Sequence, residues 1–235
     1  MCLIIYKPKG KDWDYDAVLN GFEYNPDGAG MMYQTSQGVR IERGFDDPEL
    51  LINTLLGAPE LINRAVVLHF RWATHGTVNV ANCHPFPVAK RVGEDMSLLT
   101  DIGIAHNGII PNMAKDSPHS DTVQYIQGTL ARVKHLLFNR AFGKKLLHAT
   151  HSKFAIMDAR RVKLIGEFIK DGGIFYSNDS YLPWAPLEKE EGDMALSEAR
   201  WYGDDAQSNY TLSSEAWWAE QEELWAADKH DAMLG

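Results

Sequence analysis

The amino terminus of this chain places a thiol directly before an apolar stretch that is typical of a β-strand. Cys2 is the second residue, and residues 3–6 read Leu-Ile-Ile-Tyr. If Met1 is removed, Cys2 carries a thiol and a free α-amine together. An α-amine has a pKa near 7.7 to 8 and a cysteine thiol about 8.5, so near neutral pH the amine can accept the thiol proton. The terminus therefore predicts either a nucleophile with its own base or simply the place where translation starts.

Length and composition predict a globular chain with one main domain. The 235 residues suffice for one large domain, or for a domain of about 185 residues with an appendage. Hydrophobic residues make up 45% and charged residues 23%, which is ordinary for a globular protein. Because the sequence has no long apolar run and no signal-like segment, we expect neither membrane insertion nor secretion. With only Cys2 and Cys83 as cysteines, we expect free thiols and a cytoplasmic location.

The negative charge of the chain is concentrated in its last 50 residues. Residues 186–235 hold 13 acidic and 3 basic side chains, whereas residues 1–185 hold 19 acidic and 20 basic ones. No basic patch argues for direct binding of nucleic acid. The charge step predicts a main domain over 2–185 and an acidic extension over 186–235. In that extension we expect a helix over 215–234, whose tryptophans either pack on the main domain or dock to a partner.

The order of the predicted elements indicates an α+β fold. Strands come first, helices lie between them and strands return, so alternating βαβ units are not expected. The expected strands cover 3–6, 31–35, 39–43, 64–70, 102–105, 154–158, 162–168 and 174–177. The expected helices cover 12–21, 46–56, 120–135 and 142–148.

Polar motifs follow several of these elements and suggest chemistry on a carboxamide. Attack by a thiolate creates an oxyanion, which the Asn107 side chain and the Gly108 backbone N–H can bind. Arg71, at a strand end, can clamp a carboxylate, and Asp121, at a helix start, can pair with an ammonium. Each has an ordinary alternative, namely a turn for Asn-Gly, an internal ion pair for Arg71 and a helix cap for Asp121.

A zinc site is the main alternative use of the histidines. Imidazoles and a thiolate are zinc ligands, but their spacing here matches no common zinc template. We therefore expect no metal site, and no cofactor is implied. The residues considered for it are His69, His75, Cys83, His84 and His106.

Four motifs, taken in order, resemble the class II glutamine amidotransferases, which belong to the amino-terminal-nucleophile hydrolases. The resemblance covers roughly residues 2–179. It implies a four-layer αββα sandwich of two antiparallel sheets flanked by helices, with 2–185 as a stand-alone glutamine amidotransferase type-2 domain. The motifs are Met1-Cys2, Arg71-Trp72-Ala73-Thr74-His75-Gly76 with His84-Pro85-Phe86, His106-Asn107-Gly108, and Ser120-Asp121-Thr122.

The resemblance also implies a role for each matched residue. Cys2 is the expected nucleophile, and Asn107 and Gly108 are the expected oxyanion donors. Arg71 is expected to bind the α-carboxylate of glutamine, and Asp121 its α-amino group. A lid over the substrate is expected to begin at Trp72, Thr74 and His75, with Gly76 and His84 as structural residues of the lid region. The turn at residues 24–30 departs from the better-known members, so no substrate contact is assigned to it.

The function expected from these residues is hydrolysis of the glutamine side-chain amide through a γ-glutamyl thioester on Cys2. Residues after 179 are too few for a synthase domain, so we expect a separate synthase as the partner that receives ammonia. Two alternatives stay open: an amidohydrolase for another γ-glutamyl or linear amide, and a silent module that binds an amino acid or a protein. The oligomeric state is left open.

Overall fold

Two antiparallel sheets form the centre of the molecule. The computed structural model describes residues 2–73 and 80–183. The larger sheet has seven strands in the order β10-β11-β1-β4-β2-β3-β6, and the smaller has four in the order β5-β7-β8-β9. The larger sheet comprises β1 (Leu3–Lys7), β2 (Ala29–Thr35), β3 (Gly38–Phe45), β4 (Val66–Phe70), β6 (Ser97–Thr100), β10 (Ile169–Asp171) and β11 (Ile174–Tyr176). The smaller comprises β5 (Phe86–Pro87), β7 (Ile102–Asn107), β8 (Lys153–Asp158) and β9 (Val162–Ile165).

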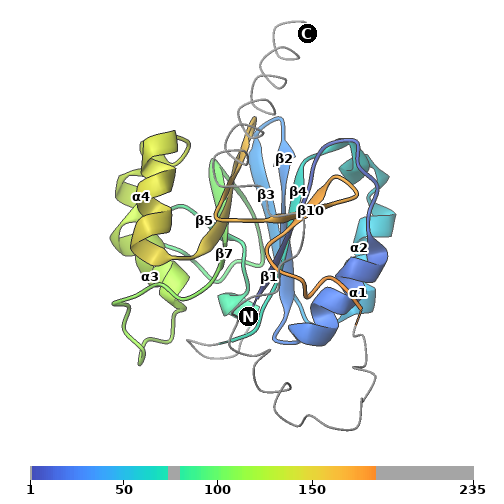
Figure 1. Cartoon of the computed structure of the whole chain (residues 1–235), viewed down its shortest axis with the longest axis horizontal. Helices are drawn as coiled ribbons and strands as arrows, with labels where there is room; N and C mark the ends of the chain where they lie inside the picture. Colours follow the sequence, from blue (N-terminus) through green and yellow to red (C-terminus); the bar gives the residue numbers. More distant parts are fainter. Residues whose placement is uncertain (1, 74–79, 184–235) are drawn as a thin grey trace, which may run out of the picture.

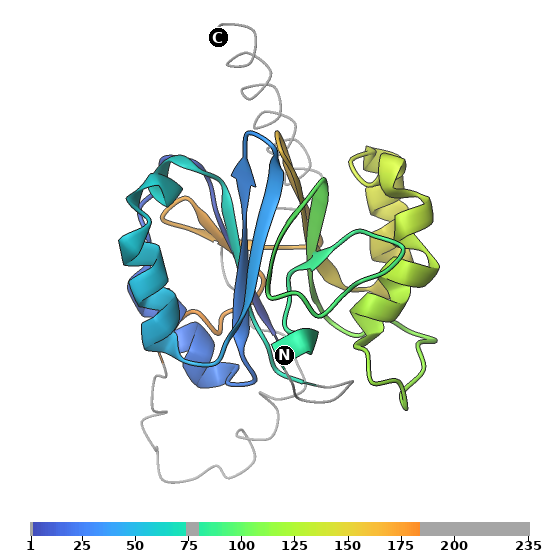
Figure 2. The same cartoon turned by 180° about the vertical axis from the view of Figure 1, so that it is seen from behind.

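Helices cover the outer face of each sheet. Helices α1 (Tyr15–Tyr24) and α2 (Pro48–Gly57) lie against the larger sheet, and α3 (Asp121–Gly128) and α4 (Arg140–Thr150) lie against the smaller one (Figures 1 and 2). Short 3-10 turns cover Pro59–Asn63, Val80–Asn82, Leu130–Arg132 and Lys134–Leu136. This arrangement confirms the predicted α+β fold, a four-layer αββα sandwich.

Three apolar clusters fill the spaces between the four layers. One lies between α1, α2 and the larger sheet and includes Leu3, Met31 and Leu68. A second lies between the sheets and includes Ile4, Val67, Ala105 and Ala155. The third lies under α3 and α4 and includes Ile104, Ile126 and Leu146. Each sheet therefore buries both faces.

The two-residue period of the strands decides which side chains point toward the second sheet. In β1, Leu3 packs toward the helices and Ile4 toward the second sheet. Leu3 is opposite Phe70 in β4, and Ile4 is opposite His69. Because successive side chains alternate, Cys2 and Arg71, one residue beyond Leu3 and Phe70, fall on the side of the second sheet. The register thus places the thiol and the guanidinium on neighbouring strand ends.

The structure matches most expected elements and alters two. The strands expected over 31–35 and 39–43 pair as the β2–β3 hairpin, and Asp47 caps α2 with Pro48 in its first turn. The helix expected over 120–135 stops at Gly128, and two 3-10 turns follow, because glycine and the β-branched Thr129 weaken the helix. The strand expected over 162–168 ends at Ile165, before Gly166 with its φ of 93°.

Two further expectations concern a membrane span and the acidic extension. No helix among the described residues is both long and apolar enough to cross a bilayer. The predicted extension over 186–235, with its helix over 215–234, lies outside the described residues.

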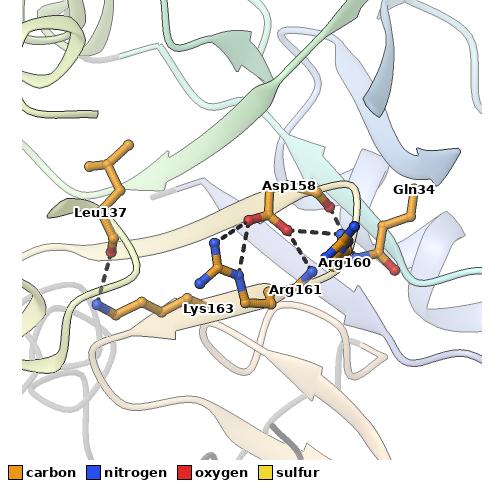
Figure 3. Close-up of polar contacts among 6 residues, drawn as sticks. All are labelled: Gln34, Leu137, Asp158, Arg160, Arg161 and Lys163. Atoms are coloured by element: carbon orange, nitrogen blue, oxygen red, sulfur yellow. Dashed lines mark hydrogen bonds and ion pairs between the residues drawn. The ribbon is translucent and has the colours of Figure 1, made fainter. Parts of the chain in front are cut away.

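A polar cluster at the β8–β9 turn ties the second sheet to its neighbours (Figure 3). The Asp158 carboxylate accepts from the backbone N–H groups of Arg160 and Arg161 at 2.8 and 2.7 Å, and from the Arg161 guanidinium at 3.0 and 2.6 Å. The Asp158 carbonyl accepts from Gln34 Nε2 on β2 at 3.0 Å. On β9, Lys163 Nζ donates to the Leu137 carbonyl at 2.9 Å, which anchors the chain before α4.

Removing the Asp158 carboxylate is expected to destabilise the protein more than removing an exposed one. We expect Asp158→Ala to lower the free energy of unfolding by about 1–2 kcal/mol, because two backbone donors of the turn lose their acceptor. The control is Asp101→Ala, which breaks a 2.8 Å ion pair with Lys134. The Asp101 side chain is 80% exposed and that of Asp158 17%, so Asp101→Ala should cost less than about 1 kcal/mol. Urea unfolding measures both, and equal losses would contradict the assignment.

Candidate active site

Four segments that are distant in sequence bring the predicted site residues into one region. Cys2 precedes β1, Arg71 follows β4, Asn107 ends β7 and Asp121 begins α3. The charges of Arg71 and Asp121 both influence the pKa of the Cys2 thiol, in opposite directions. Arg71, Asn107 and Asp121 are all buried, at 3%, 5% and 6% exposure. The nucleophile candidate is therefore near both of the charged groups expected to bind an amino acid.

The Cys2 thiol is held against one peptide unit of the strand end next to it. Trp72 N–H donates to Cys2 Sγ at 3.4 Å, and the thiol donates to the Trp72 carbonyl at 3.5 Å. Asn178 Nδ2 donates to the Cys2 carbonyl at 2.9 Å. Burial raises the pKa of the thiol above its ordinary value, although the Trp72 contact and the Arg71 charge lower it. Since the thiol then stays protonated near neutral pH, its attack on a substrate needs a base.

Asn107 is the last residue of β7 in the second sheet, and Gly108 follows it. The Asn107 side chain makes a 2.9 Å hydrogen bond with Ser177 Oγ, while its Oδ1 has no hydrogen-bond partner among the described residues. Gly108 has a φ of 142°, and a Cβ there would collide with the side chain of Ser152. A residue with a side chain is strained and crowded at this position. The glycine therefore permits close packing next to the candidate oxyanion donor.

Asp121 already supports the loop that follows Gly108. Its Oδ2 accepts from Ile110 N–H at 2.7 Å, and its Oδ1 accepts from Thr122 N–H at 2.6 Å. The side chain of Ser120, not Asp121, caps α3 by accepting from Val123 N–H. A carboxylate offers about four acceptor positions, so these contacts leave Asp121 able to accept further hydrogen bonds, for example from an ammonium.

The turn at residues 24–30 holds the Arg71 segment in place. Arg71 N–H donates to the Gly28 carbonyl at 2.9 Å, and Asp27 N–H donates to the Arg71 carbonyl at 3.1 Å. The Asp27 carboxylate accepts from Ala73 N–H at 2.7 Å. Cys83 is buried beside this turn, its thiol donates to the Asp27 carbonyl at 3.6 Å, and burial raises its pKa to about 11. The turn thus fixes the backbone on both sides of Trp72.

Two buried histidines contact Thr122 at the start of α3, and a third contacts one of them. Thr122 Oγ1 donates to Asp121 Oδ1 at 3.2 Å and lies 3.0 Å from His84 Nε2 and 2.8 Å from His106 Nδ1. Because its hydrogen is given to a carboxylate, Thr122 Oγ1 must accept from both rings. His69 Nε2 lies 3.0 Å from the His106 carbonyl and can only donate to it. The neutral rings therefore carry their hydrogens on His84 Nε2, His106 Nδ1 and His69 Nε2.

Burial keeps these three histidines uncharged. Burial lowers the pKa of His69, His84 and His106, so none carries a charge at neutral pH. Each has one ring nitrogen, His69 Nδ1, His84 Nδ1 or His106 Nε2, with no hydrogen-bond partner in the described part of the chain. Within that part, no group of three or more His, Cys, Asp or Glu residues could hold a metal ion. The network orients Asp121 through Thr122.

The expected lid residues are only partly described. Trp72 is 40% exposed, which makes it the exposed aromatic residue next to Cys2. Thr74, His75 and Gly76 lie outside the described residues. Their expected part in covering a substrate stays a prediction.

Sequence reasoning overlooked four residues that the structure places at this site. They are Asp27, Thr122, Ser177 and Asn178. Asp27 and Thr122 lie inside motifs that the sequence singled out, but their partners come from segments remote in sequence. The signal for Ser177 and Asn178 is the abrupt change from the apolar strand 174–176 to four polar residues.

Comparison with known proteins points in the same direction. Over 148 residues, which are 60% of this chain, it is 29% identical to glutamine–fructose-6-phosphate aminotransferase [isomerizing] from Fusobacterium nucleatum subsp. nucleatum. Over 95 residues, 40% of this chain, it is 33% identical to the enzyme of that name from Pseudomonas syringae pv. tomato. The matched segments span 23% and 14% of those two proteins, well under two thirds of their length.

The other comparisons add less. A solved structure titled "Structure of the allosteric regulatory enzyme of purine biosynthesis" has a TM-score of 0.47 and 13% identity, over 75% of this chain and 41% of that chain. This likeness is too weak to assign a fold, so the fold of the chain is assigned from its own sheet topology. No protein-family model matches the sequence. The similarity in sequence to these two aminotransferases supports the resemblance to the class II glutamine amidotransferases that the four motifs indicated.

Proposed function

We propose that the protein hydrolyses the side-chain amide of glutamine to glutamate and ammonia through a thioester on Cys2. The observation that carries the proposal is the position of the Cys2 thiol, held on the Trp72 peptide where the charges of both Arg71 and Asp121 act on it. A cation and an anion beside a thiol suit an α-amino acid, whose carboxylate and ammonium have the opposite charges. Glutamine presents a carboxamide at the end of a short chain from those groups.

The reaction begins with a proton transfer from the thiol. With Met1 removed, the free amine of Cys2 takes the proton as sulfur attacks the amide carbon and the S–C bond forms. This step needs a base because burial raises the pKa of the thiol. The Asn107 amide and the Gly108 N–H bind the oxyanion of the tetrahedral intermediate.

Ammonia then leaves and water completes the turnover. The ammonium form of the Cys2 amine returns its proton to the departing nitrogen as the C–N bond breaks, which leaves a γ-glutamyl thioester. Water attacks this thioester, gives its proton to the same amine, and releases glutamate and the free thiol. Each proton taken is returned, so the cycle needs no other co-reactant.

The proposal covers the hydrolysis of glutamine and not the later use of the ammonia. The names of the two relatives include fructose 6-phosphate, but the matched segments span less than a quarter of either protein. We therefore propose glutamine as a substrate of this chain and do not propose the sugar phosphate. A separate synthase as the recipient of ammonia, the domain boundary after residue 185 and a location in the cytoplasm remain parts of the proposal that rest on the sequence.

The test is the release of both products from glutamine by the purified full chain. We expect ammonia and glutamate in equal amounts, and faster hydrolysis of glutamine than of asparagine, which is one methylene shorter, or of γ-glutamyl methylamide. Faster hydrolysis of the methylamide would replace the proposal with a γ-glutamyl amidohydrolase. No hydrolysis of any of the three would reject the enzyme and favour a binding module.

A further inference from the structure

Ser177 contacts both the strand that follows Cys2 and the side chain of Asn107. It directly follows β11, is fully buried, and its N–H donates to the Ile4 carbonyl at 2.9 Å. Its Oγ accepts from Ile4 N–H at 2.8 Å and lies 2.9 Å from the side-chain amide of Asn107. One hydroxyl therefore connects β1, two residues after Cys2, to the end of β7 in the other sheet.

The hydrogen of the Ser177 hydroxyl determines which way the Asn107 amide faces. Ile4 N–H can only donate, so Ser177 Oγ accepts there and still has its own hydrogen to give. Among the described residues, the remaining partner of Ser177 Oγ is the Asn107 amide, whose Nδ2 faces it as a donor at 2.9 Å. A half-turn of that amide exchanges its oxygen and nitrogen without moving other atoms. With the oxygen toward Ser177, the hydroxyl donates to it and both groups at this contact are satisfied.

The same half-turn moves the NH2 group of Asn107 to a buried position with no partner. When Nδ2 faces Ser177, Oδ1 occupies that buried position. It has no hydrogen-bond partner there among the described residues. A buried acceptor in that place would repel an oxyanion, whereas two N–H donors would bind it. The empty hydrogen-bonding position therefore fits an anion that arrives with the substrate.

The neighbouring Asn178 holds the nucleophile side of the same arrangement. Its Nδ2 donates to the Cys2 carbonyl at 2.9 Å, and its Oδ1 accepts from the Ser180 hydroxyl at 2.6 Å and the Ser180 N–H at 3.2 Å. The Ser180 contacts define the orientation of the Asn178 amide. Consecutive residues thus anchor the nucleophile and the oxyanion donor.

We propose that Ser177 is a positioning residue that turns the Asn107 NH2 group toward the oxyanion by donating its hydroxyl hydrogen to the Asn107 oxygen. The inference rests on the proposed function for its catalytic consequence, but the orientation of the amide can be tested separately. Ser177 acts through Asn107 and touches no reacting atom.

Kinetics of Ser177→Ala test the consequence. We expect kcat for glutamine hydrolysis to fall by about 10- to 100-fold, less than the loss of a whole oxyanion donor, with KM changed by less than about threefold. The matched control is Tyr176→Phe, which removes a buried hydroxyl from the preceding residue. That hydroxyl donates to Asp14 Oδ2 at 2.9 Å on the helix side of the sheet, so kcat should be kept.

A double-mutant cycle separates positioning from general stability. In an Asn107→Ala background, Ser177→Ala should lower kcat by less than about twofold, because the group it orients is gone. Losses that multiply, or a kcat loss equal to that of Tyr176→Phe, would overturn the proposal. Thermal unfolding of each variant identifies any that fail to fold.

A neutron structure of the deuterated full chain tests the orientation without any activity. We expect the Ser177 O–D to point at the Asn107 oxygen and the ND2 group to face away from Ser177. An ND2 group pointing at Ser177 would overturn the proposal. If the expected orientation is found in a protein that does not hydrolyse glutamine, the proposed function fails and the assignment of Ser177 stands.

Discussion

Replacing Cys2 with alanine is expected to abolish glutamine hydrolysis and leave the fold intact. The thiol forms the bond to the substrate, so its loss should lower kcat by about a thousandfold or more. Its described contacts are two long hydrogen bonds to the Trp72 backbone, so the melting temperature should change little. Coupled detection of glutamate measures the turnover.

Two variants and one mass measurement control this experiment. Cys83→Ala removes the other thiol, which is buried beside Asp27, and should keep most of the turnover. Cys2→Ser keeps a small residue at position two but should be nearly inactive, because a hydroxyl is a much weaker nucleophile. Intact mass should show an active protein that begins at Cys2. Substantial turnover by Cys2→Ala, or an active protein that retains Met1, would contradict the mechanism.

Acidification from pH 6.5 to 4.5 is expected to destabilise the protein strongly because of three buried histidines. Burial lowers the pKa of His69 to about 3 and of His106 to about 4, and holds that of His84 well below its ordinary value. The Arg71 charge lowers the pKa of His69 and His84 further, while Asp121 raises that of His106. In the unfolded chain each histidine binds a proton near pH 6.5.

The sign of the effect follows from proton binding. Between pH 6.5 and 4.5 the unfolded state binds up to three more protons than the folded state, so acid favours unfolding. Each proton contributes about 1.4 kcal/mol per pH unit, so the loss over these two pH units amounts to several kcal/mol. That loss is comparable with the whole stability of a typical domain, about 5–15 kcal/mol.

Urea unfolding at a series of pH values measures this dependence. His69→Asn should flatten the slope by about a third, because one of three linked protons is removed. His148→Gln is the matched control, since His148 is exposed on α4 and should leave the slope unchanged. A free energy of unfolding that stays constant from pH 7 to 4.5, or an equal slope in His69→Asn, would contradict the linkage.

Local sequence predicted those parts of the fold that depend on neighbours along the chain. The strands of the β2–β3 hairpin and the helix α2 were expected from turn residues and from a proline at the start of a helix. The predicted α3 helix was too long. Apolar residues continue at helical spacing past Gly128, but the α-helical backbone ends there. Strands β5, β6 and β10, with two, four and three residues, were not predicted, since such short segments carry little periodicity.

The sequence by itself determined the α+β class and the candidates Cys2, Arg71, Asn107 and Asp121, because strand ends, caps and chemically distinctive side chains are local features. Only the tertiary structure decided which of these side chains lie near one another. The pairing of Leu3 with Phe70 puts Cys2 and Arg71 on the same side, toward the second sheet, and a slip of β1 by one residue against β4 would turn Cys2 away from Arg71. The contacts of Ser177 with Ile4 and Asn107 span 173 and 70 residues, and such pairs depend on the packing of two sheets, which no local pattern encodes.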